Sequence, residues 1–227
     1  MREIVLDTET TGLSPLQGDR LVELGCVEIF NHLPTGQTFH RYFNPERDVP
    51  DEVVRVHGLT NEFLADKPLF GNEAEYFLDF IADAPLVIHN APFDMGFLNA
   101  ELTRFGVPKL SKTRVVDTLP MARRKFPGAP ASLDALCKRF GVDLSARAFH
   151  GALLDAHLLA EVYLELCGGR QPGLDMAQRV LQTEAEAGQT EARSFRAPRE
   201  YKPSQAEQTA HEEFLAKIKN ALWERAS

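Results

Sequence analysis

Apolar residues in the first part of the chain are spaced in a way that predicts three β-strands. Residues 3–7 form a short apolar run, residues 21–30 are rich in apolar and β-branched side chains, and residues 37–43 alternate between apolar and polar positions. Residues 8–19 are polar and contain glycine and proline, which predicts a loop. Because the turn at 31–36 is also short, we expect these strands to form an antiparallel meander.

Further along the chain, the pattern changes to alternating strands and helices. Residues 44–72 are irregular and leave room for one or two short helices within 50–58. Apolar spacing then predicts helices over 73–82, 91–105, 118–126, 133–140 and 152–167, and strands over 86–88 and 114–117. We expect Asn90, Thr118 and Ser132 to cap helices. Three strands followed by this alternation predict an α/β fold, with a mixed β-sheet and helices on its faces.

The character of the chain changes after residue 168, which predicts three parts. The predicted folded domain covers 1–168, and the polar stretch 169–204 has no sustained period and predicts a flexible linker. Helical spacing returns in the tail, 205–227. Its apolar positions are Phe214, Leu215, Ile218, Leu222 and Trp223. A lone amphipathic helix has no core of its own, so we expect it to dock on a partner, the alternative being that it folds back on the domain.

Composition sets limits on what the protein can be. The chain has 227 residues, of which 44% are hydrophobic and 26% charged, and this balance is typical of a globular protein. Its net charge of -8 provides no overall positive field for nucleic acid, although acids that hold metals would contribute to that charge. Three widely separated cysteines predict neither disulfides nor a zinc site and suit buried positions. Without a signal-peptide pattern or a membrane-length apolar run, we expect a cytoplasmic protein with no membrane partner.

Two acids at the end of the first predicted strand are the first candidate site. Side chains alternate along a strand, so Asp7 and Glu9 point to the same face. Like charges placed together repel each other unless a cation lies between them, and carboxylate oxygens suit Mg²⁺ or Mn²⁺. A strand end with solvated acids is the ordinary alternative, since short motifs arise by chance.

Three further residues follow the same pattern of strand ends and helix starts. Asp94 is in the first turn of a predicted helix directly after a strand, where α/β proteins usually place their sites. His150 precedes Asp155 by five residues, and in a continuous helix the two would point about 140° apart. Gly151 frees the backbone, so His150 can lie before the helix and share a site with Asp155. Each residue alone has an ordinary explanation as a capping or surface group, as does His89. The combination is what favours a site.

Three motifs together resemble the DnaQ-like, or DEDDh, family of 3′–5′ exonucleases. They are Asp7-Thr8-Glu9-Thr10-Thr11-Gly12, His89-Asn90-Ala91-Pro92-Phe93-Asp94 and His150-Gly151-Ala152-Leu153-Leu154-Asp155-Ala156. The resemblance covers about residues 1–167 and implies a ribonuclease H-like fold. The segments Val56-His57-Gly58-Leu59 and 126–137 are similar to those of the proofreading members, which serve bacterial replicative DNA polymerases.

The resemblance also implies a mechanism and a set of site residues. Asp7, Glu9 and Asp155 would bind the principal of two divalent cations, Mg²⁺ or Mn²⁺, and Asp94 the second. His150 would be the general base of a hydrolysis that releases 5′-monophosphates from a single-stranded 3′ end of DNA. Because a mismatched terminus frays more easily, it would be removed first. The residues expected to contact substrate are Asp7, Glu9, Thr10, Leu13, Glu52, His57, Asn90, Phe93 and Asp155.

The tail resembles segments by which such proofreaders are tethered. Gln171, Leu174 and Met176 fit a short motif that binds the sliding clamp, although the methionine departs from the usual aromatic residue. The apolar positions of the tail helix would bind the polymerase catalytic (alpha) subunit, and a small accessory subunit is a further possible partner. Two alternatives stay open: a stand-alone exonuclease that trims RNA or oligonucleotides, and a non-catalytic subunit that tethers a polymerase assembly.

Overall fold

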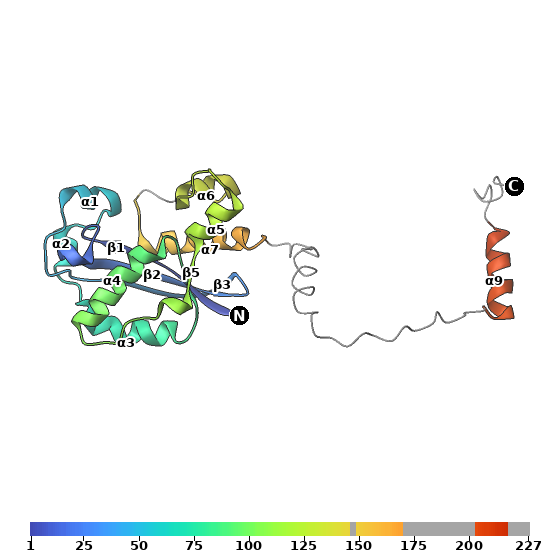
Figure 1. The fold of residues 1–227 in the computed structure, drawn as a ribbon, viewed down its shortest axis with the longest axis horizontal. Helices are drawn as coiled ribbons and strands as arrows, with labels where there is room; N and C mark the ends of the chain where they lie inside the picture. The colour runs from blue at the N-terminus through green and yellow to red at the C-terminus, as the bar shows by residue number, and fades with distance from the viewer. Residues whose placement is uncertain (146–148, 170–202, 218–227) are drawn as a thin grey trace, which may run out of the picture. The chain divides into compact units, whose positions relative to one another are not determined.

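A computed structural model describes residues 1–145, 149–169 and 203–217 of the chain. The chain divides into two compact units, Met1–Leu174 and Asp175–Ser227. The larger unit contains one five-stranded sheet with strand order β3-β2-β1-β4-β5, flanked by helices (Figure 1). The mixed α/β sheet expected from the sequence is therefore confirmed.

The first three strands form the predicted antiparallel meander. They are β1 (Arg2–Thr10), β2 (Leu21–Phe30) and β3 (Leu33–Tyr42), and β2 pairs with both neighbours. Two boundaries differ from the prediction. β1 continues to Thr10, because its polar end stays paired with β2 as far as Leu21. β3 begins at Leu33, because residues 31–32 alone make the turn.

The remaining strands, β4 (Leu86–Ile88) and β5 (Val115–Asp117), extend the sheet in parallel. The helices of this unit are α1 (Asp51–His57), α2 (Asn61–Leu64), α3 (Phe70–Ile81), α4 (Ala91–Arg104), α5 (Thr118–Lys125), α6 (Leu133–Phe140) and α7 (Ala152–Leu166). Short 3₁₀ turns occupy η1 (Pro15–Gln17) and η2 (Lys112–Arg114). The alternation of helices and strands is as predicted, with two differences. Helix α2 lies after the predicted region 50–58, where the side chain of Thr60 caps it by accepting from Phe63 N–H. Helix α3 starts three residues earlier than its apolar spacing indicated.

Helix caps agree with the sequence at one place and differ at two. The side chain of Ser132 accepts a hydrogen bond from Ala135 N–H at the start of α6, as predicted. Helix α5 is capped by Asp117 rather than by Thr118, because Asp117 ends a strand in extended conformation and its carboxylate accepts from Leu119 N–H. Asn90 precedes α4, but its side chain makes no capping bond.

Apolar side chains cover both faces of the sheet. On one face, Ile4 and Leu6 of β1 pack in a large cluster with residues of α3 and α4. On the other face, Val5 packs with Ala156 and Leu159 of α7. Helices α5 and α6 pack in turn on α7 through a third cluster. Cys26 and Cys137 are buried, as expected. Cys167 is exposed, so the prediction of a buried position was wrong for this cysteine.

The second unit contains one described helix, α9 (Gln205–Leu215). Ser204 and Glu207 form a reciprocal capping box at its start, which explains why helix begins at the predicted place. The helix runs to Leu215, and the part of the predicted tail beyond residue 217 lies outside the described residues. Phe214 is exposed. The predicted clamp and polymerase contacts Gln171, Leu174, Met176, Ile218, Leu222 and Trp223 lie outside the described residues, so they stay predictions, as does the division at 168 and 204.

Candidate active site

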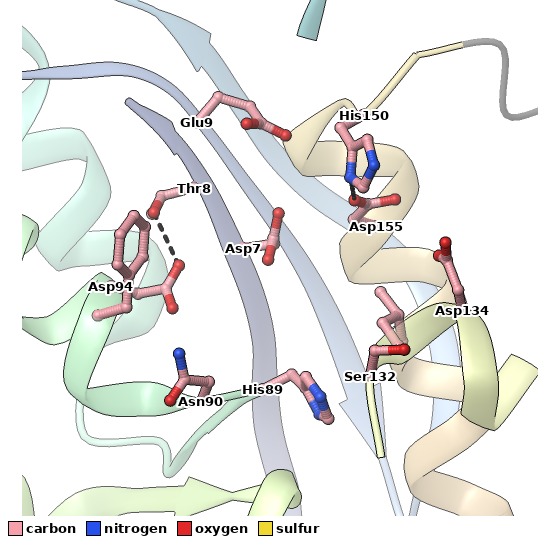
Figure 2. A pocket seen from close by; sticks show the side chains of 12 residues that line it. Asp7, Thr8, Glu9, His89, Asn90, Asp94, Ser132, Asp134, His150 and Asp155 are labelled. Atoms are coloured by element: carbon pink, nitrogen blue, oxygen red, sulfur yellow. Dashed lines mark hydrogen bonds and ion pairs between the residues drawn. The ribbon is translucent and has the colours of Figure 1, made fainter. Parts of the chain in front are cut away.

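Strand β1 distributes the first motif between the two faces of the sheet. Val5 packs against α7 and Leu6 against the α3–α4 side, so the alternation along the strand decides where the following residues point. Asp7 and Glu9 share the face of Val5 and point toward α7, while Thr8 points toward α4 (Figure 2). One strand therefore supplies acids to one helix and a hydroxyl to another.

A glycine on the neighbouring strand allows α7 to approach these acids. Gly25 of β2 pairs directly with Asp7. A Cβ atom at Gly25 would lie 2.2 Å from the backbone nitrogen of Leu153, so only glycine leaves space for the first turn of α7. That turn carries Asp155, which is buried beside Asp7. We did not predict this role for Gly25, although a glycine inside an apolar strand is the usual signal of a close backbone approach.

The second motif places Asp94 on the other side of Asp7. Asn90 adopts a left-handed conformation (φ 64°), which turns the chain from β4 into α4, and its N–H donates to Asp117 Oδ1 at 3.1 Å. Asp94 lies in the first turn and is buried. Its Oδ1 accepts a hydrogen bond from the Thr8 hydroxyl at 2.7 Å. Thr8 therefore orients the carboxylate, a role we did not predict.

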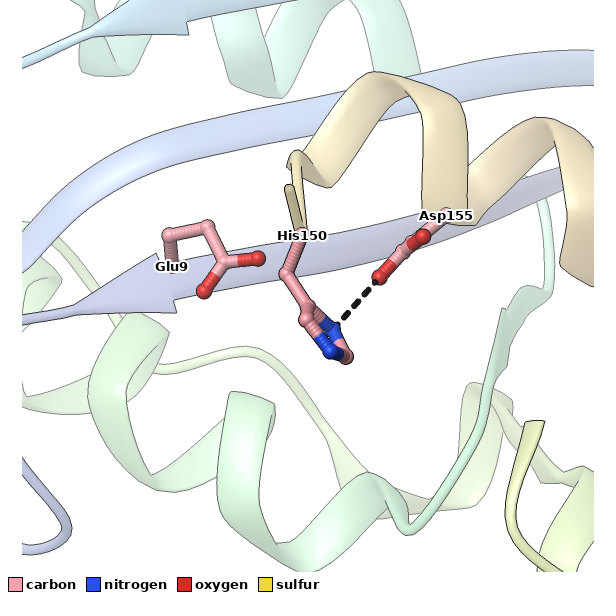
Figure 3. A group of neighbouring side chains, drawn as sticks. All are labelled: Glu9, His150 and Asp155. Atoms are coloured by element: carbon pink, nitrogen blue, oxygen red, sulfur yellow. Dashed lines mark ion pairs between the residues drawn. The ribbon is translucent and has the colours of Figure 1, made fainter. Parts of the chain in front are cut away.

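The third motif lies at the start of α7 in the arrangement expected from Gly151. The helix begins at Ala152, and Gly151 is extended (φ -145°), so His150 precedes the helix. His150 Nδ1 lies 3.3 Å from Asp155 Oδ2 (Figure 3). Ligand atoms of Glu9, His150 and Asp155 all lie within 4.8 Å of one another, close enough for one cation to contact all three.

The three motifs line one open pocket of about 280 Å³. Its lining residues are Asp7, Thr8, Glu9, His89, Asn90, Phe93, Asp94, Ser132, Leu133, Asp134, His150 and Asp155 (Figure 2). The start of α6, Ser132–Asp134, forms the wall opposite α4 and was not predicted. His89 lies in the lining, and its Nδ1 is 2.8 Å from the Thr118 hydroxyl.

Burial raises the pKa of two of these carboxyl groups, and for one of them the charges of the neighbouring acids raise it further. The pKa of Asp7 is raised well above its ordinary value, first by burial and then by the charges of Asp94, Glu9 and Asp155. The pKa of Asp94 is raised to about 7 by burial, in spite of the opposing hydrogen bond from Thr8. Acids held together at this cost suit a divalent cation, which would favour their charged forms. The donor set fits Mg²⁺ or Mn²⁺ because it consists mostly of carboxylate oxygens.

Phe93, a predicted base contact, lies both in the pocket and against the core. It lines the pocket, packs on the cluster between the sheet and α4, and its ring centroid is 5.0 Å from that of Phe97. The core packing restrains the ring at the edge of the pocket, and its contact with a nucleotide stays a prediction.

Four other predicted substrate contacts do not line this pocket. Leu13 follows β1 in the loop toward η1 and is 86% exposed, which suits a wedge against bases. Thr10 is buried and its hydroxyl donates to the carbonyl of Gly12, so it shapes that loop. Glu52 is exposed in the first turn of α1, and His57 is buried at the end of the same helix. Their contacts with substrate stay predictions.

Comparison with known proteins shows the family of this chain. A family model described as "Exonuclease" matches residues 4–163. The chain belongs to this exonuclease family. Among curated relatives, the DNA polymerase III subunit epsilon of Rickettsia felis is 52% identical over 222 residues, covering 96% of this chain and 97% of that protein. The subunit of the same name from Escherichia coli is 49% identical over 176 residues, covering 74% of this chain and 72% of that protein.

Solved structures show the same fold. The nuclease domain of 3′hExo, a DEDDh family member bound to rAMP, superposes with a TM-score of 0.63 at 18% identity, covering 73% of this exonuclease and 90% of that chain. The structure of exonuclease X in complex with 5′ overhanging duplex DNA superposes with a TM-score of 0.57 at 24% identity, covering 72% of this chain and 90% of that chain. The predicted family, ribonuclease H-like fold and metal-dependent 3′–5′ exonuclease activity are confirmed. Across the described part of the chain, no helix combines the length and the apolar character needed to span a membrane.

Proposed function

We propose that this exonuclease removes mismatched 3′-terminal nucleotides as 5′-monophosphates for a replicative DNA polymerase. The observation that carries the proposal is the convergence of Asp7, Glu9, Asp94, His150 and Asp155 on one pocket, from three separate segments of the chain. The near full-length similarity to proteins named DNA polymerase III subunit epsilon supports the link to replication.

We assign two divalent cations to the pocket. Asp7, Glu9 and Asp155 would hold the principal one, and Asp94 with Asp7 the second. The bound cations would supply Lewis-acid activation of the phosphodiester and of the attacking water. Asp7 is suited to both positions because it lies between Asp94 on one side and Asp155 on the other (Figure 2).

His150 would act as the general base. Its Nδ1 lies 3.3 Å from Asp155 Oδ2, and Nε2 would be the nitrogen that accepts the proton of the attacking water. The ring is about half exposed, so a proton taken at Nε2 can leave to solvent. Asp155 would thus orient the ring in addition to its role as a ligand.

The pocket and its surroundings suit a frayed single strand. Thr10, Leu13 and Phe93 would position the terminal bases, with Glu52, His57 and Asn90 near the terminal nucleotide. Stacking and apolar contact accept any base, so discrimination would come from the lower cost of unpairing a mismatched terminus.

The tail would keep this activity near the growing end. The segment 171–176 would bind the sliding clamp and the helical tail the polymerase alpha subunit, with a linker that raises the local concentration of the enzyme. Replacing Gln171 and Leu174 with alanine in the full chain should weaken binding to a labelled clamp without changing hydrolysis of free DNA. Unchanged affinity for the clamp would remove that part of the proposal.

The decisive experiment is single-turnover degradation of two labelled primers, one with a paired and one with a mismatched 3′ end. We expect release of 5′-monophosphate with Mg²⁺ or Mn²⁺, none with EDTA, faster on the mismatch, and largely lost in His150→Ala. Asp79→Asn is the matched control, because this exposed acid lies outside the pocket. Absence of hydrolysis with either metal would support a tethering subunit instead, and faster hydrolysis of short RNA would support the RNA-trimming alternative.

A further inference from the structure

The catalytic histidine lies on a segment that is held from outside its own helix. His150 precedes α7, and 48% of its side chain is exposed, so burial does not fix the ring. The ion pair with Asp155 restrains the ring at one nitrogen. The backbone of the segment is held by a bond from His150 N–H to the carbonyl of Val56, at 3.1 Å. The end of α1 is therefore one of the supports of the general base.

A second contact joins the same two segments. Gly58 ends α1 in a left-handed conformation (φ 78°), and its N–H donates to Val54 O at 2.7 Å. A Cβ atom at Gly58 would lie 3.4 Å from Cγ of Phe149, 3.5 Å from its Cδ2 and 3.7 Å from its Cδ1. The aromatic ring thus lies against the bare Cα of the glycine. Most of Phe149 is otherwise exposed (57%), so this ring has little part in the core of the domain.

The turn that receives Phe149 also carries a predicted nucleotide contact. His57, which lies between Val56 and Gly58 in the sequence, is buried, and its Nδ1 accepts a hydrogen bond from Leu59 N–H at 3.0 Å. The histidine is fixed within the turn, so a displacement of the turn would move His57 and the support of His150 together. The segment Val56-His57-Gly58 therefore has a structural role of its own, apart from the three motifs that carry the acids and His150.

We propose that Phe149 is a positioning residue, which docks on Gly58 of the α1 turn and thereby holds His150 at the attacking water. The inference rests on the proposed role of His150 as general base. Phe149 acts through the neighbouring residue and needs no contact with substrate. The α1 turn then aligns the terminal nucleotide and the base with respect to one another.

The test is a double-mutant cycle between Phe149→Ala and His150→Ala in the full chain, with single-turnover hydrolysis of a mismatched primer in Mn²⁺. We expect Phe149→Ala to lower kcat roughly tenfold or more with KM nearly unchanged, because a displaced base loses alignment. In the His150→Ala background, Phe149→Ala should change kcat less than about twofold, since no base is left to position. Phe149→Leu, which keeps an apolar group on the glycine, should recover most of the rate.

Gly58→Ala tests the same contact from the α1 side, because its methyl group would press on the Phe149 ring and alanine disfavours the positive φ at this position. The substitution should lower kcat. The double variant with Phe149→Ala should lose less in kcat than the product of the two single losses. Melting temperatures of all variants show whether the domain stays folded.

Three results would overturn the inference. The first is that Phe149→Ala leaves both kcat and KM unchanged. The second is a raised KM with unchanged kcat, which would mean that Phe149 contacts substrate directly, and the third is an equal loss of kcat in the presence and absence of His150. Full activity of His150→Ala would instead remove the proposed general base, so the two failures can be told apart.

Discussion

Replacing Asp94 with asparagine should make the metal-free protein more stable while destroying its activity. Asparagine keeps the size of the side chain and an oxygen that can accept the 2.7 Å hydrogen bond from Thr8. It removes a charge that burial disfavours. The folded protein without cations must either protonate this acid or tolerate its charge.

The magnitude follows from the pKa of Asp94, raised from its ordinary 3.8 to about 7. A raised pKa in an acid means that the folded state binds the proton more tightly than the unfolded state. The contribution of Asp94 to stability is then fully present below about pH 4 and is lost as the pH rises toward 7, by about 4 kcal/mol in total. For a chain of this size the loss corresponds to a shift on the order of 10 °C in melting temperature.

The assay is thermal unfolding in EDTA at pH 5 and pH 8, followed by the same scans with Mn²⁺. Asp94→Asn should raise the melting temperature most at pH 8 and less than half as much at pH 5, where the folded state already holds the proton on Asp94 but the unfolded state still releases it. Mn²⁺ should stabilise the unmodified protein more than the variant. Asp79→Asn is the control and should change neither scan. An increase in the melting temperature of Asp94→Asn that is equal at both pH values, or absent at pH 8, would refute the reasoning.

Three other predictions concern the same site. Gly25→Ala should cost about 2–3 kcal/mol or more in urea unfolding and abolish hydrolysis, because its Cβ would meet Leu153 N at 2.2 Å; an unchanged unfolding midpoint would contradict the close approach. Thr8→Val should cost about 1–3 kcal/mol at pH 8 and reduce the rate, because Asp94 loses a hydrogen bond; full activity would show that Thr8 does not orient the acid. Mn²⁺ affinity by calorimetry should rise roughly tenfold from pH 6 to pH 8, as Asp94 loses its proton before binding; a constant affinity would contradict its role as a ligand.

The spacing of residues within a few positions of one another predicted those parts of the site that depend on local backbone geometry. The period of two along β1 places Asp7 and Glu9 on one face, and the structure has them there. Gly151 predicts that His150 lies before the helix, which the 3.3 Å pair with Asp155 bears out. Both inferences depend only on residues within a few positions of each other.

Features that depend on distant pairing were beyond the sequence. The polar end of β1 looked like a loop, but its backbone is paired with β2 through Thr10, and pairing rather than propensity sets the end of a strand. The close approach at Gly25 requires knowledge of which helix crosses β2. The wall formed by Ser132–Asp134 likewise depends on how α5 and α6 pack on α7.

The division of the site between a central strand and a surface segment has a consequence for heat inactivation. β1 is paired with β2 from Arg2 to Thr10 and with β4 at Ile4 and Val5, so the doubly paired part of the strand should exchange its amides with solvent only on global unfolding. Asp7 and Glu9 follow directly in the same strand and should stay in place until then. His150 lies outside the sheet, on the segment before α7, and about half of its side chain is exposed. On warming, the enzyme should therefore lose its hydrolysis rate at a temperature where it is still folded and still binds cations.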